Sequence, residues 1–133
     1  MARTLSIAAV AAFLLALPAA AHGAAPLTGT DWTFKRVGGR AMPAKHPVHL
    51  QFEAREFGGD DDCNRYGGRY RSGPERLRFR DIISTAIGCD FAGQARPDWS
   101  RALRRTRFYR LTEGQLLLLG KRGRTLARLA PKR

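Results

Sequence analysis

The sequence predicts an α+β domain: a curled antiparallel β-sheet, partly closed like a barrel, with one packed helix. Two observations lead to this prediction. Apolar and polar residues alternate with period two over much of the chain, as is typical of half-buried strands, while helical spacing stands out in one segment, 96–108. Glycine-containing turn signals separate the alternating segments, so neighbouring strands are expected to pair as hairpins.

The first 21 residues have the layout of a secretory signal peptide. A short positive segment, 1–6, precedes an apolar run, 7–18, and small residues that suit a cleavage site. The run is too short for a membrane span, and no cysteine stands at the cleavage region to carry a lipid anchor. We expect cleavage after Ala21, or alternatively after Gly23. The product would be a periplasmic or secreted protein, without a transmembrane span, whose domain covers residues 27–130.

The chain is strongly basic, with a formal net charge of +13 that comes mostly from arginine. One interpretation is compositional: arginine-rich codon usage and a solubilising surface. The other is an anionic partner, such as lipid headgroups or a polyanionic glycan. Nucleic acid is not expected as a partner, because the protein is predicted to be exported.

Two cysteines, Cys63 and Cys89, predict one disulfide in an exported chain. Such a bridge would stabilise the fold by roughly 3–4 kcal/mol. The alternative is a pair of reactive thiols. It is less favoured, because the two residues are far apart in the sequence and neither belongs to a Cys-x-x-Cys motif.

Three segments in the first part of the domain, 30–37, 48–54 and 75–82, have the alternation of half-buried strands. In the first of them, strict alternation places Trp32 and Phe34 on one face. It places Thr33, Lys35 and Val37 on the other face. The apolar residues that the other two segments are expected to turn inward are Val48, Leu50, Phe52, Leu77 and Phe79.

The helical segment has a narrow apolar face and a basic one. Pro97 suits the first turn of a helix, and Asp98 complements the helix dipole there. The residues expected to pack are Trp99, Ala102, Leu103 and Thr106. The opposite face carries Arg101, Arg104 and Arg105, which are the candidate anion-binding residues, since arginine forks pair well with phosphate. A merely solvated charged face is the alternative.

The C-terminal part is expected to form a three-stranded meander. Segments 107–111, 115–120 and 124–130 are separated by two turn signals that each contain glycine. Four consecutive leucines, 116–119, indicate that the middle strand is covered on both faces, with the helix on one of them.

The stretch GDDDCNRYGGRY, 59–70, is rich in residues that favour tight turns, and a twisted hairpin is expected there. Its three aspartates raise the alternative of a Ca²⁺ site, but consecutive strand residues point to opposite faces. His22, as a new N-terminus, raises the alternative of a copper site completed by His46 and His49. Neither is the favoured interpretation, so no metal and no other cofactor is expected.

Catalytic residues are not expected either. A Gly-x-Ser-x-Gly nucleophile motif is missing around Ser72, Ser84 and Ser100. The spacing of Ser, His and Asp residues in the sequence does not indicate a catalytic triad either. Acidic residues such as Glu53, Glu56 and Asp81 have strand or turn positions and no pairing typical of glycosidases. The sequence therefore predicts a protein that is not an enzyme.

Four stretches follow one another along the chain: LTGTDWTF, CNRYGGRY, ISTAIGCD and EGQLLLLG. Together they resemble the META domain family, also called HslJ-like or domain of unknown function 306. The resemblance covers Leu27 to Leu129 and includes both cysteines. Asp62 stands where glycine is common in the family. The motif residues, expected to be structural, are Asn64, Gly68, Tyr70 and Thr85.

The resemblance implies a compact β-rich fold with a packed helix, and export to the bacterial envelope. It also implies a connection with heat shock and antibiotic resistance, without an established enzymatic activity. Two hypotheses follow. The first is a monomeric, non-catalytic envelope protein that acts through protein or envelope contacts under stress. The alternative is a module whose arginine-rich face binds lipid headgroups or polyanionic glycans.

Overall fold

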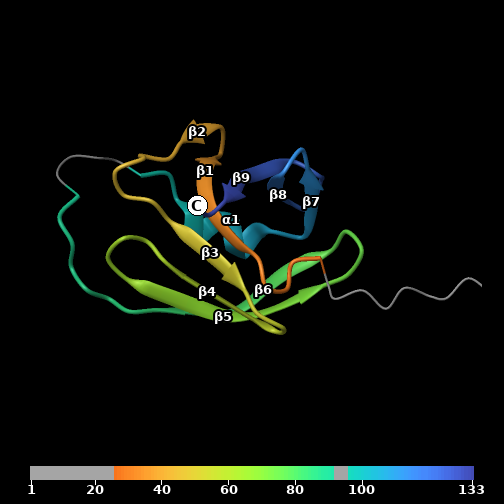
Figure 1. Ribbon diagram of the computed structural model, residues 1–133, viewed down its shortest axis with the longest axis horizontal. Coiled ribbons are helices and arrows are strands. Elements are labelled where there is room, and N and C mark those ends of the chain that lie inside the picture. Colours follow the sequence, from red (N-terminus) through yellow and green to blue (C-terminus); the bar gives the residue numbers. More distant parts are fainter. Residues whose placement is uncertain (1–25, 92–95) are drawn as a thin grey trace, which may run out of the picture.

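The computed structural model describes residues 26–91 and 96–133. In this part the chain forms nine strands and one helix, with α1 placed between β6 and β7 (Figure 1). The elements are β1 Asp31–Val37, β2 Arg40–Ala41, β3 His49–Phe52, β4 Glu56–Asp60, β5 Arg65–Ser72, β6 Leu77–Ser84, α1 Trp99–Arg105, β7 Phe108–Thr112, β8 Gln115–Leu119 and β9 Thr125–Pro131.

All strands belong to one antiparallel sheet with the order β6-β5-β4-β3-β1-β9-β8-β7, and the short β2 pairs with β1. The sheet curls until its two outer strands meet. An isolated bridge joins Arg76 to Phe108, and the Leu77 amide donates to the Arg107 carbonyl at 3.1 Å. The predicted curled, partly closed antiparallel sheet with one helix is thereby confirmed.

The core consists of the side chains that the strands turn into the curled sheet. Val48, Leu50 and Phe52 are fully buried, as their alternation predicts, and so is Leu77. The four leucines of β8 are also buried, with exposed fractions of 7% or less. Rings dominate the middle of the core, where Phe52 packs edge-on against Tyr70 at a centroid distance of 5.0 Å. This burial supplies most of the driving force for folding.

Strand β1 departs from the predicted alternation. Val37 was expected opposite to Trp32 and Phe34, but it is buried with them, at 6% exposed. The reason is a bulge: the pairing with β9 shifts between Phe34 and Arg36. One extra residue in a strand reverses the faces of all residues that follow it. Val37 therefore lies opposite Ala127, another core residue.

A second irregularity bends β6. The pairing between β5 and β6 shifts between Gly67 and Arg69, and Asp81 of β6 has a positive φ of 53°. Ile82 consequently packs against the core, while Ile83 is 75% exposed. Bulges of this kind increase local twist and help a sheet to close on itself.

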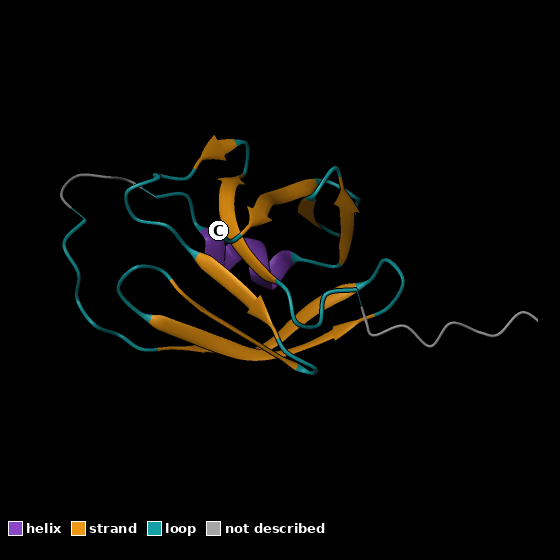
Figure 2. Cartoon of the chain, viewed as in Figure 1, coloured by secondary structure: helices purple, strands orange, loops and turns teal. Residues whose placement is uncertain are grey.

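Helix α1 lies inside the curve of the sheet, as Figure 2 shows. Leu103 is fully buried and Ala102 is 5% exposed, and the helix packs against β1, β6, β8 and β9. Trp99 contributes its ring, which lies 4.5 Å from the ring of Tyr66 between centroids. Thr106 is also fully buried, and its hydroxyl donates to the Ala102 carbonyl at 2.7 Å.

The helix begins slightly later than the sequence suggested. Asp98 is the N-cap, and its carboxylate accepts a hydrogen bond of 2.9 Å from the Arg101 amide. Pro97 therefore precedes the cap and does not belong to the first turn. Because aspartate is a favoured N-cap residue, its side chain satisfies an amide that the helix itself leaves without a partner.

Two glycines in neighbouring strands provide a matched test of this packing. A Cβ at Gly68 would lie 2.5 Å from the Arg80 carbonyl oxygen, whereas a Cβ at Gly58 would lie 3.5 Å from the Tyr66 carbonyl oxygen. We predict that Gly68→Ala lowers the free energy of unfolding by about 1–3 kcal/mol because backbone atoms must move apart. Gly58→Ala should be neutral or stabilising by up to about 1 kcal/mol, because it stiffens the unfolded chain. Urea unfolding of the oxidised protein measures both, and equal losses would contradict the packing described.

Candidate functional site

Two regions of the structure gather polar side chains and are candidate functional sites. The first joins the turn between β4 and β5 to the segment that follows β6. The second lies where the end of α1 meets the turn between β8 and β9. The first contains two of the motif residues singled out from the sequence, Asn64 and Thr85, and the second contains one of the three candidate anion-binding arginines, Arg105.

In the first region a disulfide and an asparagine hold two distant segments together. Cys63 and Cys89 are bonded, with their Cα atoms 6.2 Å apart. The Asn64 side-chain oxygen accepts hydrogen bonds from the Ile87 amide at 2.6 Å and from the Thr85 hydroxyl at 2.8 Å. The Asn64 side-chain nitrogen donates to the Ile87 carbonyl at 3.0 Å. These contacts tie the turn between β4 and β5 to the segment that follows β6, where the Thr85 amide also donates to the Arg65 carbonyl at 2.9 Å.

The tyrosines of β5 are buried and also bond to backbone. The Tyr66 hydroxyl donates to the His49 carbonyl, and the Tyr70 hydroxyl donates to the Glu53 carbonyl at 2.5 Å. Burial raises the pKa of Tyr66, and the charges of Asp60 and Asp61 raise it further. Tyr66 therefore stays protonated and serves as a hydrogen-bond donor to β3, which is separated from β5 by β4.

The three aspartates, 60–62, have separate partners. Asp60, the last residue of β4, accepts a hydrogen bond of 3.2 Å from the Asp62 amide. Asp61 accepts hydrogen bonds from the amides of Cys63 and Asn64, at 3.1 and 2.7 Å, and pairs with Arg96 at 3.2 Å. Asp62 contacts His46 at 2.8 Å. Among the described residues no three His, Cys, Asp or Glu side chains come close enough to hold a metal ion. His22 lies outside the described residues.

Asp62 explains a difference between this chain and the family pattern. Its φ is +69°, in the left-handed region where an L side chain is disfavoured and glycine is not. Aspartate tolerates this conformation better than most residues do. The turn thus has a backbone conformation that suits glycine, with aspartate in that position.

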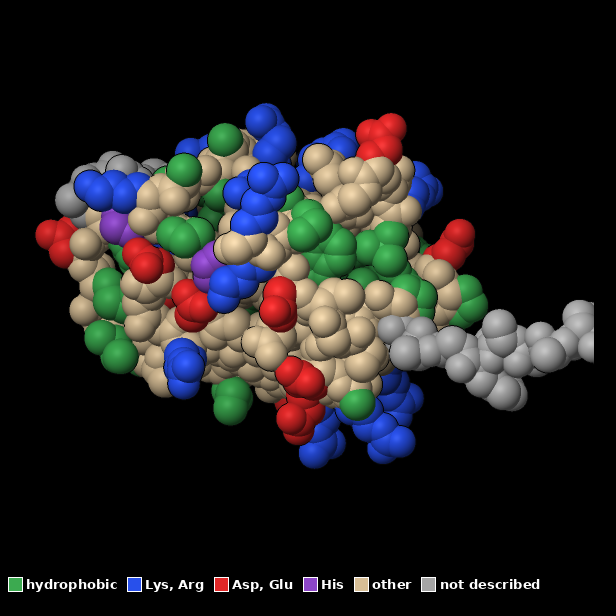
Figure 3. All heavy atoms as spheres, in the orientation of Figure 1, with side chains coloured by type: hydrophobic (Ala, Val, Ile, Leu, Met, Phe, Trp, Pro, Cys, Tyr) green, Lys and Arg blue, Asp and Glu red, His purple; other side chains and the backbone are tan. Residues whose placement is uncertain are grey.

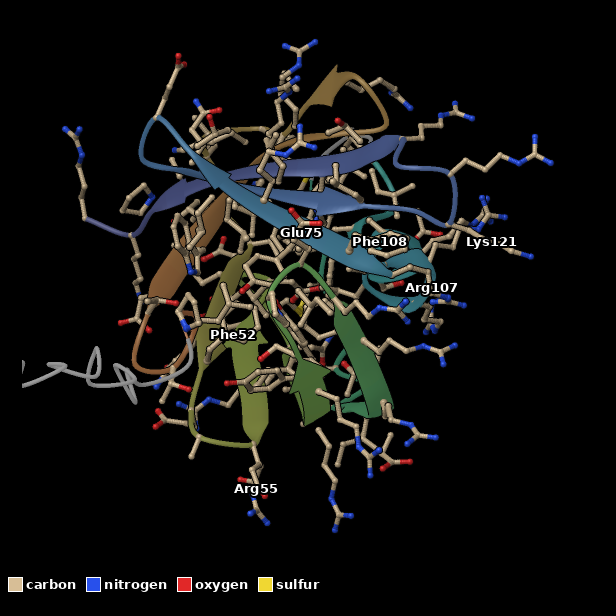
Figure 4. All side chains as sticks on the ribbon, turned by 90° about the vertical axis from the view of Figure 1, so that its right-hand side faces the viewer. Phe52, Arg55, Glu75, Arg107, Phe108 and Lys121 are labelled. Atoms are coloured by element: carbon tan, nitrogen blue, oxygen red, sulfur yellow. A yellow bond between two sulfur atoms is a disulfide. The ribbon has the colours of Figure 1, made fainter. Side chains whose placement is uncertain are left out.

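The second region is a hollow of about 310 Å³ between the end of α1 and the β8–β9 turn, called here the basic hollow. None of the eleven acidic residues of the chain lines it. Figure 4 shows Arg107 and Lys121 on the same side of the molecule. The residues that line the basic hollow are Arg105, Arg107, Gly120, Lys121, Arg122, Arg124 and Leu126.

The cations of the basic hollow are mostly unneutralised. Within residues 26–91 and 96–133, the side chains of Arg105, Lys121, Arg122 and Arg124 form neither a hydrogen bond nor an ion pair. Arg107 differs, since its guanidinium donates to the Arg104 and Thr106 carbonyls at 3.0 and 2.8 Å. Like charges around one hollow raise one another's energy, and a bound anion would relieve that repulsion. By contrast, basic and acidic side chains are interspersed on the face in Figure 3.

A second hollow, called here the helix hollow, lies beside the basic hollow and measures about 290 Å³. Four arginines and one carboxylate, Asp98, line it, beside the mostly buried side chains of Val37, Pro97 and Ala102; the arginines are Arg40, Arg101, Arg105 and Arg124. Asp98 lies 3.4 Å from the Arg101 guanidinium. The hydrogen bond from the Arg101 amide lowers the pKa of Asp98, with help from the Ser100 hydroxyl and nearby arginines and against the effect of burial. Asp98 is therefore charged and neutralises Arg101 locally.

The structure separates the three candidate arginines of the helix. Arg105 lines both hollows and Arg101 lines the helix hollow, but Arg104 lines neither and donates to the Ser100 hydroxyl at 3.1 Å. The candidate residues predicted from the sequence did not include Lys121, Arg122 and Arg124. The signal was the run Gly120–Arg124, in which all five positions are cationic or glycine, but nothing in the sequence showed that this turn meets the helix.

These features define a small α+β domain with a curled antiparallel sheet, an enclosed helix and a disulfide-linked turn. The family profile described as the META domain matches residues 25–133, and the chain belongs to this family. The resemblance noted in the sequence is thereby confirmed.

Two solved structures are similar to this chain. An NMR structure of a protein from Burkholderia xenovorans is 26% identical, with a TM-score of 0.59 over 80% of this chain and 83% of that one. A second NMR structure, 21% identical, shares the fold with a TM-score of 0.58 over 77% of this chain and 89% of the other. No curated protein matches the chain. None of the helices in the described ranges is long and apolar enough to cross a bilayer.

Proposed function

We propose that this META domain protein is an exported, non-catalytic protein that binds an anionic component of the cell envelope through the basic hollow. The observation that carries the proposal is the set of five cations around one hollow without a carboxylate. Lipid headgroups and polyanionic glycans are the ligand classes. A role in stress or antibiotic tolerance is part of the proposal, supported by the family resemblance alone, and loss of the protein without any change in tolerance would contradict that part.

Export is supported by the disulfide and by the composition of the first 21 residues. Disulfides persist in oxidising compartments and are rare in the cytosol. We predict that protein purified from its own cells begins at His22 and has a mass two hydrogens below that of the reduced chain. Intact mass spectrometry with and without reduction measures both. Free thiols and a retained N-terminal segment would contradict the proposal.

A non-catalytic role is supported by the polar side chains that could act in catalysis, because they already form hydrogen bonds within the fold. Asn64, Thr85 and Tyr66 are committed to hydrogen bonds that hold the fold. His49 contacts the Thr33 hydroxyl at 3.0 Å, but Thr33 is only 8% exposed, so this pair has little access to a substrate. A buffered screen for hydrolysis of ester, phosphate and glycoside reporters tests this part, and turnover that the purified protein alone supplies would overturn it.

Binding through the basic hollow has a defined energetic scale. A Lys or Arg close to an anionic membrane surface contributes about 1 kcal/mol at physiological salt. Several Lys and Arg side chains around the basic hollow can therefore bind an anionic surface without burying the ligand deeply. Salt screens these contacts, with a Debye length of about 8 Å at physiological ionic strength.

We predict that replacing Arg122 and Arg124 by glutamine weakens binding to phosphatidylglycerol vesicles by about 30-fold, since two contacts of about 1 kcal/mol are lost. Vesicle co-sedimentation measures this. Binding of the wild type should also fall steeply when sodium chloride is raised from about 50 mM to about 500 mM.

The matched control replaces Arg71 and Arg78, which face each other on β5 and β6, by glutamine. Both are exposed and neither lines the basic hollow, so the net charge changes equally while the hollow is intact. The control should weaken binding by less than about threefold, because its charges lie away from the contact surface. Equal losses in the two double variants would show that net charge alone drives the association, and the site would be rejected.

A further inference from the structure

Three hollows adjoin one another beside the start of β9. The third, called here the strand hollow, measures about 150 Å³ and is formed by β1, the turn after it and β9. The helix hollow lies in the middle, because it shares Arg105 and Arg124 with the basic hollow. It shares Gly38 and Thr125 with the strand hollow, and Leu126 lines all three. The three hollows therefore form one continuous surface, called here the basic band.

Positive charge extends over the whole basic band. Arg36, Arg40, Arg101 and Arg128 add to the five cations of the basic hollow, and the one carboxylate of the band, Asp98, is already paired with Arg101. Arg36 and Arg128 face each other across β1 and β9, and like charges directly opposite destabilise a sheet. Within the described ranges, the side chains of Arg40 and Arg128 form neither a hydrogen bond nor an ion pair. Anions along the band would offset this repulsion.

The basic band is too long for one anionic group. Arg124 precedes β9 and Arg128 lies within it. At the usual rise of a strand these two residues are up to about 13 Å apart. Opposite charges influence each other strongly within about 4–6 Å. A single phosphate in the basic hollow therefore leaves the cations of the strand hollow without an anion.

We propose that the basic band binds one extended polyanionic glycan, whose repeated anionic groups occupy the basic, helix and strand hollows in turn. The inference rests on the proposed function, which assigns anion binding to the basic hollow. It chooses between the two ligand classes left open there, and it adds the helix and strand hollows to the binding site.

The chemistry of the basic band favours a glycan over other polyanions. Val37 and Ala102 at the helix hollow are only 6% and 5% exposed, and Leu126 packs against the core. An acyl chain would therefore find little apolar surface there. Single-stranded nucleic acids bind largely by stacking their bases on aromatic side chains, and no aromatic residue lines the three hollows. A chain of sugars with repeated anionic groups needs neither an apolar wall nor an aromatic platform.

Simultaneous contacts make the affinity depend on the length of the glycan. A disaccharide occupies one hollow at a time, whereas a longer chain engages all three, and linked contacts raise the overall affinity by about 10²–10⁴. Repetition of the unit without simultaneous contacts raises the affinity only in proportion to the number of units, about fourfold for four units. The length dependence therefore separates one extended site from a single anion pocket.

The test compares heparin disaccharide with heparin octasaccharide on the oxidised protein, because both carry the same anionic groups on chains of different length. Isothermal titration calorimetry measures both affinities, and the wild type should bind the octasaccharide about 100-fold more tightly. Octasaccharide binding should also fall more steeply with salt, since more ion contacts release more counterions. Phosphatidylglycerol vesicles and a single-stranded oligothymidylate represent the lipid and nucleic-acid alternatives.

A double variant tests the part of the band outside the basic hollow. Arg40→Gln with Arg128→Gln removes one cation from the helix hollow and one from the strand hollow, and both side chains are exposed. It should weaken octasaccharide binding by about 30-fold, because two ion contacts are lost. Disaccharide binding should change by less than about threefold, because the basic hollow keeps its five cations.

The matched control is the variant in which Arg71 and Arg78 are replaced by glutamine, which changes the net charge equally. It should weaken octasaccharide binding by less than about threefold. Far-ultraviolet circular dichroism and thermal unfolding establish that each variant is folded. If the double variant in the band fails to fold, Arg128→Gln alone should weaken octasaccharide binding by about fivefold.

The outcomes are distinguishable. A length preference above about tenfold, which the variant in the band lowers and the control keeps, supports the glycan assignment. A smaller preference, or equal losses in the variant and its control, overturns the assignment; the proposed function then stands if loss of Arg122 and Arg124 still weakens disaccharide or vesicle binding. Binding of vesicles or oligothymidylate without the octasaccharide also overturns it, in favour of a lipid or a nucleic acid. If none of these anions binds, the proposed function fails together with the inference.

Discussion

The packing of α1 against the inner side of the curled sheet is the interaction on which the rest of the structure depends. The helix has only seven residues, and isolated helices shorter than about 12–15 residues are marginal in water. Its stability therefore comes from burial of Ala102, Leu103 and Thr106 and from the Asp98 cap. In return, the helix fills the curve of the sheet, which without it would leave the inner faces of four strands uncovered.

The position of the helix also determines the charge distribution. Because Leu103 and Thr106 are held in the core, Arg105 and Arg107 come out beside the β8–β9 turn. The motif region contributes indirectly: the Cys63–Cys89 disulfide and the Asn64 amide hold the start of the connection between β6 and α1. The basic hollow lies on a different part of the domain from these contacts.

The sequence predicted most of the elements because their burial pattern is local. Leu50 and Phe52 alternate with polar residues and are buried, and the C-terminal meander follows from glycine turns between apolar runs. Val37 was assigned to the wrong face, because a bulge adds a residue without any local signal in composition. The β6 bulge at Asp81, a non-glycine residue with positive φ, is similarly hidden.

The candidate site was predictable only in part, because only some of its residues are grouped by a local pattern in the sequence. Arg101 and Arg105 were found from helical spacing, which is local. Their grouping with Arg124 depends on which turn the helix end faces, and that is set by the order of strands in the closed sheet. Pairing over such sequence distances is decided by the whole core and not by any one segment.

The most direct test of the account is an amide NMR titration of the oxidised protein with glycerol phosphate at low salt. If the basic hollow is the anion site, shift changes will concentrate at the amides of residues 104–107 and 120–124 and will disappear in the variant that lacks Arg122 and Arg124. Changes centred on β4, β5 and β6, or an even spread over all exposed arginines, would contradict the central claim.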